Sequence, residues 1–171
     1  MGFQNKTAVI TGGALGIGRC LTRAFAQAGA KVAFFDRDQR AGQENLEFLR
    51  QAGKDVLFFR GDGENPKDLE AFVRETVNTY GNIDYLINNM CINNGGILTP
   101  CGYEDFLAVL KVGVAAPYYL TQRFLPYFNP GGCVVNLSST RAFQSQENTE
   151  SYTAAKGGIT ALTHAMAVSL A

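Results

Sequence analysis

Five short apolar runs recur along the chain, separated by helix-length stretches with an amphipathic pattern. This order is typical of a parallel sheet with helices on both faces, because each parallel crossover usually contains a helix. We predict strands at Thr7–Thr11, Lys31–Phe35, Val56–Phe59, Ile83–Asn88 and Gly132–Leu137. We predict helices at Gly16–Ala28, Gln39–Ala52, Pro66–Tyr80, Glu104–Leu125 and Tyr152–Leu170. The expected fold is an α/β domain of the Rossmann type over residues 1–171, with a doubly wound parallel sheet in three layers.

Local signals support several of these boundaries. Asn65 can cap the third helix, Pro66 has the dihedral angle of a first helical turn, and Asp68 complements the helix dipole. Gly29, Gly53 and Gly81 each follow a predicted helix end, where a left-handed residue is favoured.

Composition and charge narrow the classes of function. Acidic and basic side chains number 15 each, so no basic excess indicates a nucleic acid or an anionic membrane as a partner. The four cysteines show no CxxC spacing, which favours reduced thiols over a disulfide framework, and we expect no metal site. The N-terminus carries no signal-peptide pattern, and no apolar run could span a membrane. We expect a soluble, cytoplasmic protein.

A glycine-rich loop, Thr11–Gly18, follows the first predicted strand and opens the first predicted helix. Glycines let the backbone approach a pyrophosphate, while the helix N-terminus presents free N–H groups and a partial positive charge. Such turns also occur for structural reasons, but the strand before and the helix after favour a nucleotide site. The residues expected to bind the nucleotide here are Gly12, Ala14, Leu15, Gly16, Ile17 and Gly18.

An acid, Asp36, follows the second predicted strand about 20 residues beyond this loop. A carboxylate there can accept hydrogen bonds from the adenosine ribose and would repel the 2′-phosphate of NADP. Arg37 leaves NADP open, since an arginine at this point could pair with that phosphate. The loop contributes no further basic residue, so the expected cofactor is NAD.

Tyr152 and Lys156 are four residues apart, on one face of the last predicted helix. A phenol with a pKa near 10 is a poor base at neutral pH, but a nearby ammonium lowers that pKa. The tyrosine could then exchange a proton with an alcohol or carbonyl oxygen as hydride moves to or from nicotinamide. Ser139, just beyond the last predicted strand, could hydrogen-bond the same oxygen. Alone, a tyrosine four residues before a lysine is equally typical of a surface helix.

Taken together, these motifs make the chain, from Lys6 to its last residue, resemble the short-chain dehydrogenase/reductase family. The resemblance rests on the glycine loop, on Asp62, on Asn88-Asn89, on Ser139 and on the Tyr152/Lys156 pair. It implies that Ser139 and Tyr152 are catalytic and that Lys156 also holds the nicotinamide ribose. It further implies that Asp62 and Gly63 belong to the adenine site and that Asn88 lies against the cofactor. The implied substrate is a small alcohol or carbonyl compound.

Two departures from the family pattern concern the site itself. Where the family usually reads Asn-Asn-Ala-Gly, Met90 and Cys91 take the last two positions and could crowd the cofactor. Gly113 aligns with an asparagine that completes a proton relay in the family, and it weakens its helix by about 1 kcal/mol relative to alanine. Pro117 adds a kink. We expect a slower relay and predict that Gly113→Asn raises turnover.

A third departure is length. Family members usually continue for two more strands and a substrate-covering segment, whereas this chain ends in a helical stretch, Gly158–Ala171, without a cap. We therefore expect a fold truncated at its C-terminus and lacking the last strands, with the fifth strand as a hydrophobic edge. Three functions stay open: an NAD-dependent oxidoreductase, a nucleotide-binding module without turnover, and a fragment that only dimerises.

The remaining features are expected to be structural. The pairs Phe34-Phe35 and Phe58-Phe59 should lie in the core. His164 is expected to be a packed or interface residue. Arg141 borders a loop, 144–150, that either is solvated or contacts substrate. By resemblance, the last two long helices would form the contact of a homo-oligomer.

Overall fold

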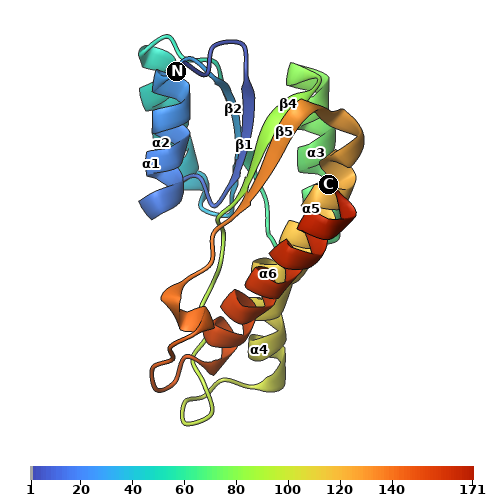
Figure 1. Ribbon diagram of the computed structural model, residues 1–171. Coiled ribbons are helices and arrows are strands. Elements are labelled where there is room, and N and C mark those ends of the chain that lie inside the picture. The colour runs from blue at the N-terminus through green and yellow to red at the C-terminus, as the bar shows by residue number, and fades with distance from the viewer. Residues whose placement is uncertain (1) are drawn as a thin grey trace.

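Five parallel strands form the sheet of the computed structural model, which describes residues 2–171 (Figure 1). The strands lie in the order β3-β2-β1-β4-β5. Their bounds are Thr7–Thr11 for β1, Lys31–Asp36 for β2, Val56–Arg60 for β3, Ile83–Asn88 for β4 and Phe128–Asn136 for β5. The order reverses between β1 and β4, the kind of position where doubly wound sheets bind ligands at the carboxyl ends of their strands. The predicted fold class is confirmed.

Helices cover both faces of the sheet, as Figure 1 shows. The helices α1 (Gly16–Gln27) and α2 (Gln39–Gln51) pack on one face, and α3 (Pro66–Tyr80) and α5 (Ala116–Phe124) pack on the other. The long helix α6 (Glu150–Ser169) crosses α4 (Tyr103–Leu110) and the segment that follows α4. Within residues 2–171, no helix combines the length and the apolar character needed to cross a bilayer.

Neighbouring residues of a strand point into different cores. Ile10 and Phe34 belong to the core beneath α1 and α2, whereas Val9 and Phe35 belong to the core beneath α3 and α5. Every residue of β1 is buried, which explains why this strand reads as a continuous apolar run. The predicted aromatic core is confirmed for Phe34 and Phe35, which are fully buried.

The partner aromatic residues, Phe58 and Phe59, are only partly buried because β3 is an edge strand. Phe58 stacks on Phe34 with ring centroids 4.9 Å apart, and Phe59 stacks on Phe35 at 6.1 Å. The predicted helix signals are also confirmed. The Asn65 side chain accepts a hydrogen bond from the Lys67 N–H, and the three glycines that follow helix ends have positive φ angles.

The single helix predicted over Glu104–Leu125 was wrong. The chain instead forms α4, a π-helical segment η1 (Lys111–Ala115) and then α5. Pro117 has no N–H for the carbonyl of Gly113, four residues earlier, so an unbroken α-helical hydrogen-bond ladder is impossible here. The proline therefore lies at an interruption, as the predicted kink implied.

Two other boundaries differ from the prediction. The strand β5 begins at Phe128 rather than Gly132, because Phe128 pairs with Ile83 before an irregularity in the register with β4. The helix α6 begins at Glu150, two residues earlier than predicted. The predicted edge position of β5 is confirmed, with Val135 partly exposed. His164 is exposed on α6, so it is not packed within this chain, and the alternative of an interface residue stays a prediction.

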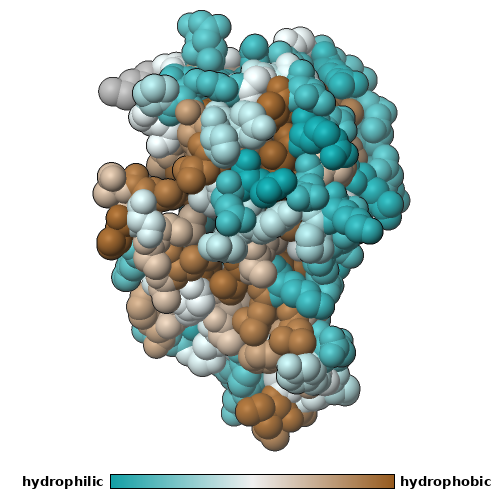
Figure 2. Space-filling view, turned by 90° about the vertical axis from the view of Figure 1, so that its right-hand side faces the viewer, coloured by the Kyte–Doolittle hydropathy of each residue, from teal (hydrophilic) through white to brown (hydrophobic). Residues whose placement is uncertain are grey.

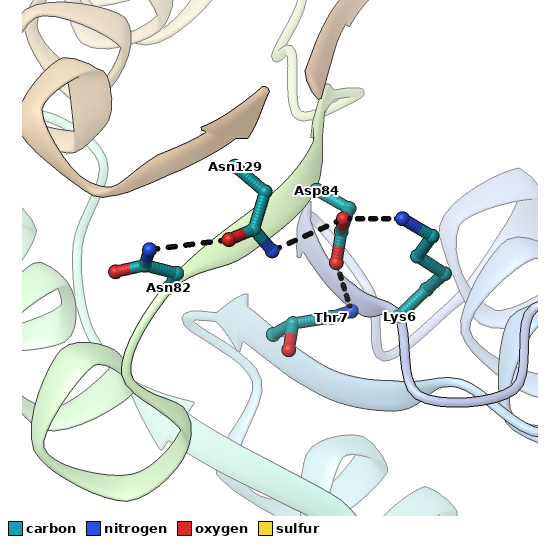
Figure 3. Close-up of polar contacts among 5 residues, drawn as sticks. All are labelled: Lys6, Thr7, Asn82, Asp84 and Asn129. Carbon is teal, nitrogen blue, oxygen red and sulfur yellow. Dashed lines mark hydrogen bonds and ion pairs between the residues drawn. The ribbon is translucent and has the colours of Figure 1, made fainter. Parts of the chain in front are cut away.

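A polar cluster joins β1, β4 and β5 where these strands begin, at the edge opposite the glycine loop (Figure 3). Asp84, only 3% exposed, accepts hydrogen bonds from Lys6 Nζ at 2.9 Å, from the Thr7 N–H at 2.9 Å and from Asn129 Nδ2 at 3.1 Å. The amide of Asn82 extends the cluster by donating to Asn129 Oδ1. Since the carboxylate is bonded on several sides, it fixes the starts of three strands relative to one another.

Candidate functional site

The glycine loop joins β1 to α1 in a conformation that requires glycine. Gly12 and Gly16 have φ angles of +66° and +54°. A β-carbon on Gly18 would overlap the carbonyl oxygen of Gly12, so only a glycine lets α1 lie this close to the loop. The N–H groups of Gly12 and Gly13 bind the carbonyl of Phe35, which ties the loop to the end of β2. No side chain among the described residues caps the N-terminus of α1.

A cleft of about 310 Å³ opens beside this loop, at the carboxyl ends of the strands. Its walls include seven of the predicted cofactor-binding residues: Gly12, Leu15, Gly16, Asp36, Arg37, Asp62 and Gly63. Ala14 is fully buried behind the wall, and Ile17 is exposed on α1, so neither lines the cleft. The structure therefore brings seven of the predicted residues to one cleft and places Ala14 and Ile17 outside its lining.

Asp36 supports the loop as well as the cleft. Its carboxylate accepts hydrogen bonds from the Ala14 N–H at 2.9 Å and from the Asp38 N–H at 3.0 Å. These bonds hold the carboxylate at the mouth of the cleft, and a carboxylate has further lone pairs for ligand hydroxyl groups. Arg37, directly after it, is exposed.

Sequence reasoning missed the hydrogen bonds that join the glycine loop to the end of β4. The Asn89 amide donates to the carbonyls of Thr11 at 3.0 Å and Gly12 at 3.1 Å, and the Thr11 hydroxyl accepts from the N–H groups of Asn89 and Met90. These contacts span almost 80 residues of sequence, so local patterns could not reveal them. The only available signal was the presence of paired asparagines at a strand end.

Asn88 occupies a different place from Asn89. It is 3% exposed and donates to Asn136 Oδ1 at 2.8 Å, which joins the ends of β4 and β5. Its own Oδ1 is buried and has no hydrogen-bond partner among the described residues. Asn136 in turn donates to the Thr163 hydroxyl, so the bond network reaches α6.

The three predicted catalytic residues lie near the same strand ends. Lys156 is 5% exposed, and its Nζ donates to the carbonyl of Leu137 at 2.6 Å and lies 5.5 Å from the ring centroid of Tyr152. Burial lowers the pKa of Lys156, and the nearby Cys91 thiol partly opposes this shift. Ser139 follows β5 and caps a short helix η3 (Thr140–Ala142) by accepting from the Arg141 N–H.

Hydroxyl groups beside these residues fasten α6 to its surroundings. Ser138 donates to the carbonyl of Lys156 at 3.1 Å and lies 2.6 Å from the Thr160 hydroxyl. Ser151, next to Tyr152, is fully buried and donates to the carbonyl of Gly95 at 2.7 Å. Both serines were missed, because hydroxyl groups that bind main-chain carbonyls follow no sequence spacing.

Met90 and Cys91 do line the cleft, as their place after β4 led us to expect. A β-carbon on Gly63 would lie 2.9 Å from Met90 Sδ, and one on Gly12 would lie 3.1 Å from the Met90 Cβ. The Met90 side chain therefore lies between the glycine loop and Gly63. Its bulk is accommodated because both of these neighbours are glycines.

The residues present fit a dinucleotide. The loop leaves open space beside Gly16, which lines the cleft and where a β-carbon would meet no atom within 4 Å, and uncapped N–H groups of α1 are available to a diphosphate. Asp36 stands at the end where an adenosine ribose would lie, and Lys156 and Tyr152 stand near the ends of β4 and β5. Binding, acid–base chemistry and substrate orientation are therefore all possible at one edge of the sheet.

The family profile described as short chain dehydrogenase matches residues 6–171. An uncharacterised oxidoreductase of Thermotoga maritima is 39% identical over 172 residues, covering 98% of this chain and 66% of that protein. The L-fucose dehydrogenase of Mus musculus is 32% identical, covering 97% of this chain and 60% of that protein. The chain thus spans slightly less than two thirds of the length of these relatives.

Solved structures give the same match. A short-chain dehydrogenase/reductase of Burkholderia phymatum in complex with NAD is 28% identical with a TM-score of 0.90, covering 97% of this chain and 60% of that one. A blue fluorescent protein from a metagenomic library, in complex with NADPH, is 25% identical with a TM-score of 0.93, covering 99% and 70%. The fold therefore occurs with either nicotinamide coenzyme.

Proposed function

The chain belongs to the short-chain dehydrogenase family, and on this premise we propose that it transfers hydride between NAD(H) and a secondary alcohol or ketone. The observation that carries the proposal is the position of Lys156, whose ammonium lies 5.5 Å from the Tyr152 ring near the strand ends that also carry the glycine loop. We further propose that residues 1–171 form a single nucleotide-binding domain.

Tyr152 acts as the acid–base residue in this proposal. The buried ammonium of Lys156 stabilises the phenolate and so makes proton exchange with the substrate oxygen possible near neutral pH. Ser139 donates a hydrogen bond to the same oxygen and orients it. The nicotinamide, when bound, supplies or accepts the hydride.

Asp36 and the glycine loop would hold the cofactor. The loop and the first turn of α1 bind the diphosphate, while Asp36 binds the adenosine ribose and disfavours a 2′-phosphate. Asp62 and Gly63 line the cleft where the adenine would lie. Arg37 is the feature that favours NADP instead, and similar structures hold each of the two coenzymes.

Binding and turnover can be tested separately. Titration of the protein with NADH and NADPH, followed by fluorescence, gives the affinity for each, and tighter binding of NADH is expected. Reduction of a panel of ketones with NADH, and oxidation of L-fucose with NAD, then tests turnover; L-fucose is included because a relative is an L-fucose dehydrogenase. If neither NADH nor NADPH binds, the proposal is refuted.

A second candidate is a nucleotide-binding module without turnover. It is favoured by Gly113, which lacks the amide that the family usually places there, and by the bulk of Met90 and Cys91 in the cleft wall. NADH binding without reduction of any ketone in the panel would support this candidate. In either case we propose a homo-oligomer that uses the face of α4, α5 and α6, on which apolar side chains gather in the lower half of Figure 2.

A further inference from the structure

Gly113 is buried in η1 at the point where this segment meets α6. A β-carbon on Gly113 would lie 2.9 Å from the Ala155 Cβ and 3.2 Å from Cys91 Sγ. Both distances are shorter than ordinary carbon contacts, so neighbouring side chains already occupy the space beside this glycine. The predicted gain from Gly113→Asn is therefore unsupported, because the longer side chain has no room unless Cys91 or α6 moves.

A second close contact fixes the same crossing of helices. A β-carbon on Gly158 would lie 3.0 Å from Val114 Cγ2. The segment η1 and α6 thus meet through Gly113 against Ala155 and through Val114 against Gly158, on both sides of Lys156. Close packing of this kind leaves little freedom for the turn of α6 that carries Lys156.

Cys91 completes this packing from the cleft side. It is partly buried, lines the cleft, and directs Sγ toward Gly113. Burial raises the pKa of the Cys91 thiol, and the charge of Lys156 acts in the opposite direction. The sulfur is therefore near enough to Lys156 for the two groups to influence each other.

We propose that Cys91 is a positioning residue for Lys156. Its side chain fills the space left by Gly113 and thereby sets the distance between the cleft wall and the Ala155–Lys156 turn. Residues 91 and 113 form a matched pair, since a side chain at 113 would press on Cys91 Sγ as well as on Ala155. The effect on chemistry rests on the proposed function, whereas the packing of the pair does not.

A double-mutant cycle tests the packing. We expect Gly113→Ala to lower the melting temperature by about 3 to 10 °C through overpacking, and Cys91→Ala to lower it by a smaller amount. The double variant should lower the melting temperature by less than the sum of the two single losses, because removal of Sγ relieves one of the two close contacts of the new β-carbon and leaves only the one with Ala155 Cβ. The control is Gly157→Ala, since a β-carbon on Gly157 meets no atom within 4 Å and should not lower the melting temperature. Additive losses would overturn the matched pair.

Thiol alkylation tests the proximity to Lys156 without any substrate. The rate at which iodoacetamide modifies Cys91 is followed by peptide mass spectrometry as a function of pH, in the wild type and in Lys156→Met. Loss of the ammonium should make the Cys91 reaction about threefold slower at pH 8, because less thiolate forms, while the exposed Cys20 keeps its rate. An unchanged rate at Cys91 in a folded variant would refute the proximity of the thiol to the Lys156 ammonium.

The chemical effect is measured last. In a wild type that turns over, Cys91→Ala should lower kcat by about tenfold, or ~1.4 kcal/mol, and change the Kd for NADH by less than about twofold. The similarly shaped Cys91→Ser should recover most of kcat. An unchanged kcat in Cys91→Ala would overturn the positioning role. If the wild type does not bind NADH, the proposed function is refuted. The double-mutant cycle and the alkylation rates then still test whether Cys91 packs beside Gly113 and near Lys156.

Discussion

The Asp36 carboxylate accepts a hydrogen bond from the Ala14 N–H at 2.9 Å, so the residue proposed to select the cofactor also holds the glycine loop in place. One role is the hydrogen bond to the Ala14 N–H, and the other is the proposed hydrogen bond to the cofactor ribose. The bond to Ala14 keeps the loop against β2, and the carboxylate, which also lines the cleft, has further lone pairs for a ligand hydroxyl. A change at this position should therefore affect both affinity and coenzyme preference.

We expect Asp36→Asn to weaken NADH binding by about tenfold. The variant should also prefer NADH over NADPH less strongly than the wild type does, because the anion that repels the 2′-phosphate is gone. Fluorescence titration with both coenzymes measures this. The matched control is Asp38→Asn, since Asp38 caps α2 through the Ala41 N–H and should alter stability rather than coenzyme preference. Equal loss for both coenzymes in Asp36→Asn would contradict the ribose role.

Tyr152→Phe removes the proposed acid–base hydroxyl and leaves the ring in place. We expect kcat to fall by at least about 100-fold, as for loss of a general acid–base group, with the Kd for NADH nearly unchanged. Steady-state kinetics and NADH titration on the same preparation separate the two effects. As a control, Tyr118→Phe changes an exposed tyrosine on α5 and should leave kcat unaffected. Normal turnover in Tyr152→Phe would exclude this residue as the proton donor.

The sequence predicted the scaffold of the site better than its connections. The bounds of β1, α3 and β4 were confirmed, because continuous burial and capping residues leave a local record in the sequence. The π-helical turn at Lys111–Ala115 was missed, since Pro117 signals an interruption without specifying its geometry.

Contacts between distant residues left no such record. The hydrogen bonds of Asn89 to the glycine loop depend on the distance between elements that are far apart in the sequence. The short distance between Cys91 and Gly113 does so too. Periodicity defines which face of an element is buried, but not which partner lies within 3 Å of it. Gly113 therefore looked like a missing side chain, although the structure shows an occupied space.

Stability should depend on pH through Asp84. Burial raises the pKa of this carboxyl, but the hydrogen bonds from Lys6, Thr7 and Asn129 outweigh burial and hold the pKa below its usual range. The folded state therefore gives up this proton at lower pH than the unfolded state does, whose pKa is about 3.9. The stabilisation is complete above that value and is lost as the pH falls through the folded-state pKa.

We expect Asp84→Asn to reduce the free energy of unfolding at pH 7 by about 1 to 3 kcal/mol and to flatten its fall between pH 5 and 3. Urea unfolding at a series of pH values measures both. Glu44→Gln, which breaks an exposed ion pair with Arg40, should change neither by more than about 0.5 kcal/mol. A wild-type acid dependence retained in Asp84→Asn would show that another carboxyl controls it.

Gly18 should be essential for the shape of the glycine loop, because its α-carbon lies directly against the Gly12 carbonyl at the start of the loop. A β-carbon there would overlap the Gly12 carbonyl oxygen and crowd the Asn89 amide, so Gly18→Ala must push α1 away from the loop. The N–H groups of the first helical turn would then no longer converge on a diphosphate. We expect NADH affinity to fall by at least about tenfold while far-ultraviolet circular dichroism stays unchanged. Gly157→Ala, a helical glycine with open space around it, should bind NADH as the wild type does. If both variants bind equally well, the diphosphate is held elsewhere than at the N-terminus of α1.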